Sequence, residues 1–362
     1  MNSADSFSAN YAEARAKFRA TAQEAGGALE TIANPNRAPD GGDLSTDVAW
    51  FGPREAERVL VMVSGTHGGE GFCGSGAQID WLRRGEHTTT APADLGVLMI
   101  HAINPYGFAW LRRVTEENVD LNRNWIDFSQ PAPANPGYDE LADVAVPPTW
   151  TEESQRASNR VLRAYAADHG PMGLQQALSG GQYRHPKGVF YGGDGPSWAR
   201  RTQEAIYGAY LGQAGKIAII DYHTGLGPWG YAEPIMSQPA ETAAYQRGQT
   251  WWGCNVTCPS DGSSTSAETA GDNLTAAPLV LAHAEVTGMA LEYGVQTLAE
   301  VFLALRADAW LHAYGDPLSP EGQAIKAQIR AAFYGDADDW KGMVAGQSLA
   351  ACRQAIAGLG RG

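Results

Sequence analysis

His67 and Glu70 lie three residues apart in the segment Ser64-Gly-Thr-His67-Gly-Gly-Glu70-Gly, directly after an apolar run. Two ligands this close in a turn can converge on one ion, and the glycines permit the tight backbone that convergence requires. A catalytic zinc takes three protein ligands and keeps one position open, and two histidines with one glutamate form such a set. His223, in Asp221-Tyr-His-Thr-Gly after another apolar run, is the expected third ligand. The pattern therefore predicts a zinc site, although manganese, iron and cobalt accept the same ligand types.

Glu292 closes a further apolar run, in Leu291-Glu-Tyr-Gly, where a charge is costly unless it has a partner or a chemical role. A glutamate beside a metal-activated water can accept its proton. Glu285 lies near the other end of the same predicted strand. Glu292 is the favoured general base because Tyr293-Gly294 marks the carboxyl end of the strand, where ligands bind in open α/β sheets.

An arginine-rich loop lies between Asn104 and Trp125 and contains Arg112, Arg113 and Arg123. Guanidinium forks bind carboxylates and developing oxyanions well, so these side chains are candidates for binding a substrate. The alternative is surface pairing with acidic residues of the same loop, Arg112 with Glu116 and Arg123 with Asp120.

Alternating apolar and helical patterns indicate the elements that must position these residues. Continuous apolar runs predict buried strands at 59–64, 97–103, 216–222 and 286–293. Helices are predicted at 3–25, 78–84, 152–168, 197–212 and through much of 297–362, with loops at 34–42, 131–148 and 251–277. This alternation predicts a single three-layer α/β/α domain over residues 1–362, with a mixed, mostly parallel central sheet.

Composition narrows the functional classes. The chain has 362 residues, 44% hydrophobic and 18% charged, and a net charge of −14, which disfavours nucleic acid as a partner. No apolar run is long enough for a membrane helix, and the polar N-terminus does not resemble a signal peptide. Four cysteines are too few for a disulfide framework, so the protein is predicted to be cytoplasmic. Cys254 and Cys258 are predicted to be buried or partly buried thiols, with a local disulfide as the alternative. His101, inside an apolar run, is predicted to be a buried structural histidine.

Taken in order, the motifs resemble those of the zinc carboxypeptidase superfamily. They are His67-Gly-Gly-Glu70, Asn104-Pro-Tyr-Gly-Phe108, Asp120-Leu-Asn-Arg-Asn-Trp125, His223 and Glu292. The resemblance covers residues 59–294, and the segments around His67 and His223 are most similar to a bacterial branch described only as a domain of unknown function. It implies a zinc carboxypeptidase-like, or phosphorylase/hydrolase-like, fold with one zinc ion per chain on His67, Glu70 and His223.

The resemblance also implies roles for the remaining site residues. Asn122 and Arg123 would bind the terminal carboxylate of the substrate, and Arg113 would stabilise the oxyanion, with Arg112 as its competitor. Glu292 would act as general base and then as general acid. The expected substrate is a small peptide or an N-acyl amino acid. No tyrosine between Gln246 and Glu292 matches the substrate-capping tyrosine of that family.

Three other functions were weighed. A zinc deacylase of N-acyl amino acids, aspartoacylase- or desuccinylase-like, would share the zinc ligands and the Asn-Arg pair, but Asn124-Trp125 favours the carboxypeptidase side. A serine esterase would use His67-Gly-Gly as an oxyanion loop and needs a G-x-S-x-G turn, to which Gly195-Pro-Ser197-Trp-Ala199 is the nearest match. A metal-containing binding domain without turnover would lack the catalytic arginine and glutamate.

Overall fold

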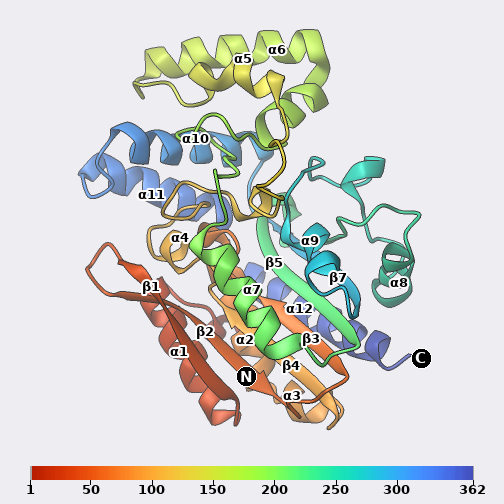
Figure 1. The fold of residues 1–362 in the computed structure, drawn as a ribbon. Helices are drawn as coiled ribbons and strands as arrows, with labels where there is room; N and C mark the ends of the chain where they lie inside the picture. Colours follow the sequence, from red (N-terminus) through yellow and green to blue (C-terminus); the bar gives the residue numbers. More distant parts are fainter. Residues whose placement is uncertain (1, 362) are drawn as a thin grey trace.

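The computed structural model describes residues 2–361, in which a seven-stranded sheet carries helices on both faces (Figure 1). The strand order is β1-β2-β4-β3-β5-β7-β6. β4, β3, β5 and β7 run parallel, whereas β1, β2 and β6 join in antiparallel pairs. The strands are β1 (Ala28–Arg37), β2 (Asp43–Phe51), β3 (Arg58–Val63), β4 (Leu95–His101), β5 (Lys216–Trp229), β6 (Ala232–Ile235) and β7 (Glu285–Gly294). The predicted mixed α/β fold with a parallel centre is confirmed.

The helices alternate with these strands and continue beyond the last one. They are α1 (Tyr11–Glu24), α2 (Gly71–Arg83), α3 (Glu86–Thr89), α4 (Pro105–Ala109), α5 (Pro136–Ala145), α6 (Glu152–Ser179), α7 (Trp198–Leu211), α8 (Ala243–Trp252), α9 (Asn273–Val280), α10 (Leu298–Tyr314), α11 (Pro320–Phe333) and α12 (Asp338–Leu359). Short 3-10 turns lie at Ser3–Ser6, Gly68–Glu70, Leu121–Arg123 and Pro259–Asp261.

Alternation along the central strands builds two hydrophobic layers. In β3, Leu60 and Met62 pack into the layer that contains α1, α2 and α12, while Val61 and Val63 pack into the layer of α7 and α9. Successive side chains of a strand point to opposite faces, so a strand covered on both sides must be apolar throughout. This is why the continuous apolar runs identified the four central strands correctly.

The outer strands and the connections were predicted less well. The hairpin of β1 and β2 was not predicted, and the loop expected at 34–42 overlaps β1. This edge strand mixes polar and apolar residues, and most of them are at least partly exposed. The loop expected at 131–148 contains α5. α6 begins at a capping box of Thr151 and Ser154 and runs past 168 to Ser179, with a bend at Gly170.

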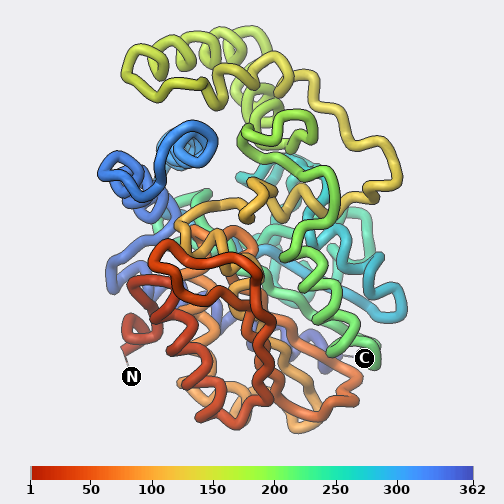
Figure 2. Tube along the Cα trace, turned by 60° about the vertical axis from the view of Figure 1, so that its left-hand side comes forward, coloured from red at the N-terminus to blue at the C-terminus, as the bar shows by residue number. Residues whose placement is uncertain are grey.

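Parallel pairing brings the predicted site residues to one edge of the sheet. β3 ends at Val63, which is paired with Asp221, and just beyond that point His223 of β5 is paired in register with Glu292 of β7. Figures 1 and 2 show α5 and α6 as a separate layer at the top of the molecule, with α10 and α11 below them.

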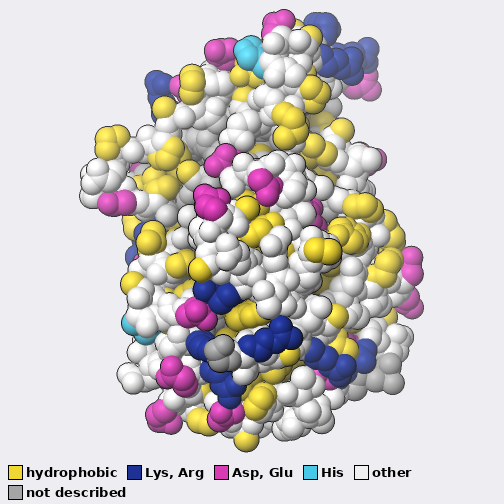
Figure 3. Space-filling model, turned by 90° about the vertical axis from the view of Figure 1, so that its right-hand side faces the viewer, with side chains coloured by type: hydrophobic (Ala, Val, Ile, Leu, Met, Phe, Trp, Pro, Cys, Tyr) yellow, Lys and Arg dark blue, Asp and Glu magenta, His cyan; other side chains and the backbone are white. Residues whose placement is uncertain are grey.

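On the face drawn in Figure 3, basic side chains gather in the lower half and again at the top right, and apolar side chains are scattered. Within residues 2–361, no helix combines the length and the apolar character needed to cross a membrane. Cys254 and Cys258 are free thiols, and the expected burial holds for Cys258 but not for Cys254, which is exposed.

His101 is buried in β4 as predicted, with its ring stacked on Phe18 and its Nε2 2.9 Å from the hydroxyl oxygen of Ser75. Burial lowers its pKa to about 4. The unfolded chain, with an ordinary pKa of about 6.5, therefore binds more protons than the folded chain between about pH 6.5 and 4. The stabilising effect of a neutral His101 is full above this window and is lost as the pH falls through it.

We expect the free energy of unfolding to drop by about 2 kcal/mol between pH 7 and pH 5 through this one residue. Urea denaturation of the wild type and of His101→Gln at both pH values measures the free energy of unfolding. The carboxylates titrate equally in the two proteins, so the difference between their pH-dependent losses of stability is the contribution of His101. Parallel pH profiles for the two proteins would contradict the expectation.

Candidate metal centre

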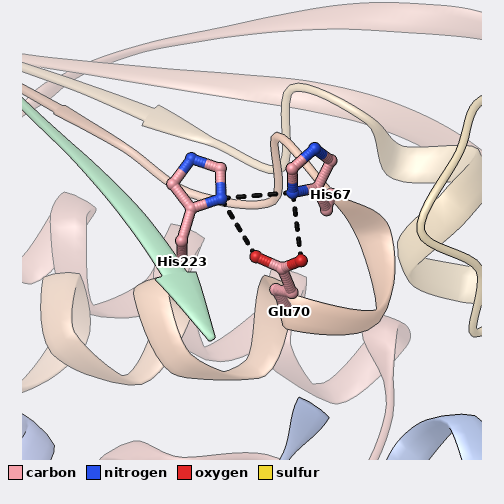
Figure 4. A group of neighbouring side chains, drawn as sticks. All are labelled: His67, Glu70 and His223. Atoms are coloured by element: carbon pink, nitrogen blue, oxygen red, sulfur yellow. Dashed lines mark hydrogen bonds and ion pairs between the residues drawn. The ribbon is translucent and has the colours of Figure 1, made fainter. Parts of the chain in front are cut away.

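His67, Glu70 and His223 form a compact donor set at the carboxyl edge of the sheet (Figure 4). Nδ1 of His67 lies 3.0 Å from Oε1 of Glu70, and Nδ1 of His223 lies 3.0 Å from Oε2 of the same carboxylate. The two Nδ1 atoms are 3.2 Å apart. All three side chains are buried. The structure thus brings together the three residues that the sequence analysis proposed as ligands.

These distances fit a tetrahedral metal site. Bonds of about 2.0–2.1 Å to a tetrahedral zinc place neighbouring ligand atoms about 3.3 Å apart, close to the observed 3.0–3.2 Å. When each imidazole donates from Nε2, its Nδ1 presents a lone pair. Two such lone pairs facing each other at 3.2 Å repel unless a cation lies between them. The geometry and the chemistry of the donors therefore suit a divalent metal ion.

Two aspartates lie behind the imidazole rings: Asp120 is within hydrogen-bond geometry of His67, whereas Asp221 is close to His223 without that geometry. Nε2 of His67 lies 3.1 Å from Oδ1 of Asp120, and Nε2 of His223 lies 3.1 Å from Oδ2 of Asp221. The Thr66 hydroxyl donates a hydrogen bond to Asp221 at 2.8 Å. Carboxylates in this position hold a metal-binding histidine in one tautomer and make it a better ligand. The contact of Asp120 with His67 joins residues 53 positions apart and was not predicted from the sequence.

Charge within the cluster favours an ionised Glu70. Burial alone would raise its pKa, but the positive charge that His67 and His223 carry when they are protonated, and their hydrogen bonds to the carboxylate, lower it overall. The amide of Thr224 also donates to Oε2 of Glu70 at 3.0 Å. A carboxylate held in its charged form by such partners is ready to bind a cation.

The backbone around Gly68 explains the glycines of this loop. The amides of Gly68 and Gly69 donate to the carbonyl oxygens of Arg113 and Arg112, at 3.2 and 2.7 Å. A Cβ at Gly68 would lie 1.9 Å from the carbonyl carbon of Gly107, so no other residue fits. The metal-binding loop and the arginine loop are therefore built against each other.

Glu292 reaches the same site from β7. Its Oε1 accepts a hydrogen bond from the amide of Leu226 at 2.9 Å. Burial, and after it the negative charge of Glu70, raise the pKa of Glu292 to about 8. The competitor Glu285 is at the opposite end of β7, where it is exposed and pairs with Arg247 at 3.3 Å.

The two neighbouring arginines have different surroundings. Arg113 donates from Nε to Asp120 at 2.8 Å and from Nη1 to Glu70 at 3.1 Å, and it lines the cavity above the metal ligands. Arg112 points away and pairs with the buried Asp308 at 3.2 Å. The alternative pairing of Arg112 with Glu116 does not occur, because Arg112 pairs with Asp308 instead. The alternative pairing of Arg123 with Asp120 does not occur either, because Asp120 pairs with Arg113.

Asn122 and Arg123 lie on the wall of the same cavity. The Arg123 guanidinium is buried and donates to the backbone carbonyls of Ser179 and Asn122, at 3.2 and 2.7 Å. Its charge therefore has no carboxylate in ion-pair contact among residues 2–361. A buried, unpaired guanidinium that faces a cavity favours an anionic ligand.

The cavity has a volume of about 520 Å³. Besides the residues described above, its wall includes Phe190, Phe333 and the inner faces of α6 and α10. This contribution was not predicted from the sequence, which indicates a surface loop at 131–148 and a helix that ends at 168. The apolar residues of α6 at four-residue spacing were the signal that could have revealed it.

No serine nucleophile is present at the position weighed for an esterase. The hydroxyl of Ser197 caps α7 by accepting a hydrogen bond from the amide of Arg200 at 3.2 Å, and the residue begins a helix without a preceding strand.

Comparison with known families identifies the chain. Residues 7–347 match the family described as "Protein of unknown function (DUF2817)", and the chain belongs to this family. The predicted similarity to a branch described only as a domain of unknown function is confirmed. Comparison with curated proteins gives no match.

Several solved structures are distantly similar. Carboxypeptidase A from Helicoverpa armigera is 12% identical, with a TM-score of 0.49 over 90% of this chain and 74% of that one. Bovine thrombin-activatable fibrinolysis inhibitor is 9% identical, with a TM-score of 0.45 over 97% of each chain. An aspartoacylase family protein from Mesorhizobium loti is 13% identical, with a TM-score of 0.37 over 78% of this chain and 67% of that one. These likenesses are remote, so the chemistry has to be argued from the site.

Proposed function

We propose that the protein is a zinc-dependent hydrolase that cleaves an amide bond next to a free carboxylate, in the manner of a carboxypeptidase. The observation that carries the proposal is the donor set of His67, Glu70 and His223, whose two histidines line one cavity together with Glu292 and Arg123. The order of the motifs along the chain, which resembles that of zinc carboxypeptidases, supports it.

A divalent metal held by these three residues would supply the activation of a water molecule and the polarisation of the scissile carbonyl. Glu292 accepts the proton of the attacking water and later passes it to the leaving nitrogen. Its raised pKa suits this exchange, and a cation beside it would lower that pKa toward neutrality.

Arg113 and Arg123 have separate tasks. Arg113 uses Nε and Nη1 on Asp120 and Glu70, which leaves Nη2 without a partner among residues 2–361 and free to donate to an oxyanion. Arg123, with Asn122 beside it, binds the carboxylate of the substrate and so places the amide bond over the metal ligands. The substrate is a short peptide or an N-acyl amino acid, because both carry an amide next to a carboxylate.

Metal analysis combined with a substrate screen tests the proposal. We expect about one zinc per chain, hydrolysis of compounds with a free carboxylate next to the amide, loss of activity on chelation and its return with zinc. Serine-directed inhibitors should have no effect. Zinc binding without hydrolysis of any peptide or N-acyl amino acid would instead support a binding domain, and chelator-resistant hydrolysis would exclude the metal mechanism.

A further inference from the structure

The cavity extends from the metal ligands between two apolar helix faces. α6 contributes Leu162, Ala166, Leu174 and Leu178, which are spaced by four residues on either side of the bend at Gly170. α10 contributes Leu298, Val301, Phe302 and Leu305, with the i, i+3, i+4, i+7 spacing of one helical face. Leu298 is 49% exposed, so this part of the cavity opens to solvent beside α10.

Three of the polar side chains that line this extension, Gln175, Ser179 and Ser237, already have hydrogen-bond partners. Gln175 donates to the carbonyl of Thr265 at 3.2 Å, and the Ser179 hydroxyl donates to the carbonyl of Gln175 at 2.7 Å. Ser237 donates to Asp272 at 2.7 Å. The charged groups with capacity to bind substrate are gathered at the metal end of the cavity.

This division decides between the two substrate types. A peptide would bring an amide N–H and a carbonyl for every residue into the apolar extension, and each buried polar group without a partner is costly. An alkyl chain needs no hydrogen-bond partner and gains free energy from burial. The apolar walls, which are continuous with the metal site, therefore fit an acyl chain better than a peptide.

We infer that the substrate is an N-acyl amino acid with a long apolar acyl chain, whose carboxylate lies at Arg123 and whose chain lies between α6 and α10. The inference rests on the proposed hydrolysis. One water is consumed: its oxygen bonds to the acyl carbon, the C–N bond breaks, and the proton passes to the amino nitrogen. The products are a fatty acid and a free amino acid.

A chain-length series tests the inference directly. The probes are N-acetyl, N-butyryl, N-octanoyl and N-lauroyl derivatives of alanine, leucine, phenylalanine and glutamate, together with tripeptides that end in the same amino acids. We expect kcat/KM to rise about 4-fold for each methylene buried until the cavity is full. Equal or falling values with chain length, or a preference for the tripeptides over the octanoyl compounds, would overturn the inference but leave the proposed function standing.

Variants locate the chain in the cavity. Leu174→Gln should lower the ratio of lauroyl to acetyl kcat/KM by about 10-fold or more. Val161→Gln, on the outer side of α6 where Val161 is 45% exposed, should leave the ratio unchanged. An equal effect of both substitutions would contradict the assignment of this wall.

Binding gives a readout that does not depend on turnover. Calorimetric titration of the zinc-loaded Glu292→Gln variant should show tighter binding of N-lauroyl than of N-acetyl amino acids. If the wild type hydrolyses no compound but this preference is seen, the proposed hydrolysis is contradicted and the binding of an acyl chain in the cavity is still supported. If the titration shows no preference, the binding of an acyl chain in the cavity is contradicted.

Discussion

Glu70→Gln is expected to abolish zinc binding and hydrolysis together. Glu70 is the only anionic member of the donor set, and both of its oxygens face a histidine Nδ1 at 3.0 Å. The amide keeps the size of the side chain and one oxygen that can accept the hydrogen bond from Thr224, so the fold should persist. Zinc per chain, measured by elemental analysis after dialysis, should fall far below one, and hydrolysis should drop to the level of the chelated wild type.

A stability measurement separates metal loss from misfolding. Zinc that binds only the folded state stabilises the wild type by about 2.7 kcal/mol at a free concentration of 100 times Kd, and the variant should gain nothing. Glu285→Gln, at the exposed far end of β7, is the matched control and should behave as wild type. Full zinc content in Glu70→Gln would show that this carboxylate is not a ligand.

Glu292→Gln is expected to lower kcat by about 10²- to 10⁴-fold, the usual contribution of a general acid–base residue, while zinc remains bound. Glutamine can accept the hydrogen bond from Leu226 as the carboxylate does, but it cannot take a proton from water. The measurement is kcat on the best substrate of the screen, with zinc content determined on the same preparation.

The outcome separates three roles of this glutamate. Loss of turnover with retained zinc supports a proton-transfer role. Loss of both would place Glu292 among the groups that hold the metal. Turnover equal to that of Glu285→Gln would remove Glu292 from the mechanism, and the general base would then have to be sought elsewhere in the cavity.

Local sequence was sufficient for the features that depend on neighbouring residues. The apolar runs of β3, β4, β5 and β7 have one stable environment, a strand covered on both faces, so these strands and the mixed α/β fold were predicted. His67 and Glu70 are close in the chain and follow a strand end, and together with His223 after another apolar run they indicated a metal site.

Only the tertiary structure decided which of the equivalent side chains meet. Arg112 and Arg113 have almost the same local sequence, and they differ because Asp308, 196 residues from Arg112 along the chain, arrives on α10 to pair with it. The contact between Asp120 and His67 likewise joins residues that are 53 positions apart in the chain, and only the folded structure brings them together. The edge strands, α5 and the extension of α6 over the site were also not predicted. These segments bury their apolar side chains only against elements that are distant in the sequence. Long-range packing, rather than local propensity, therefore determines where they lie.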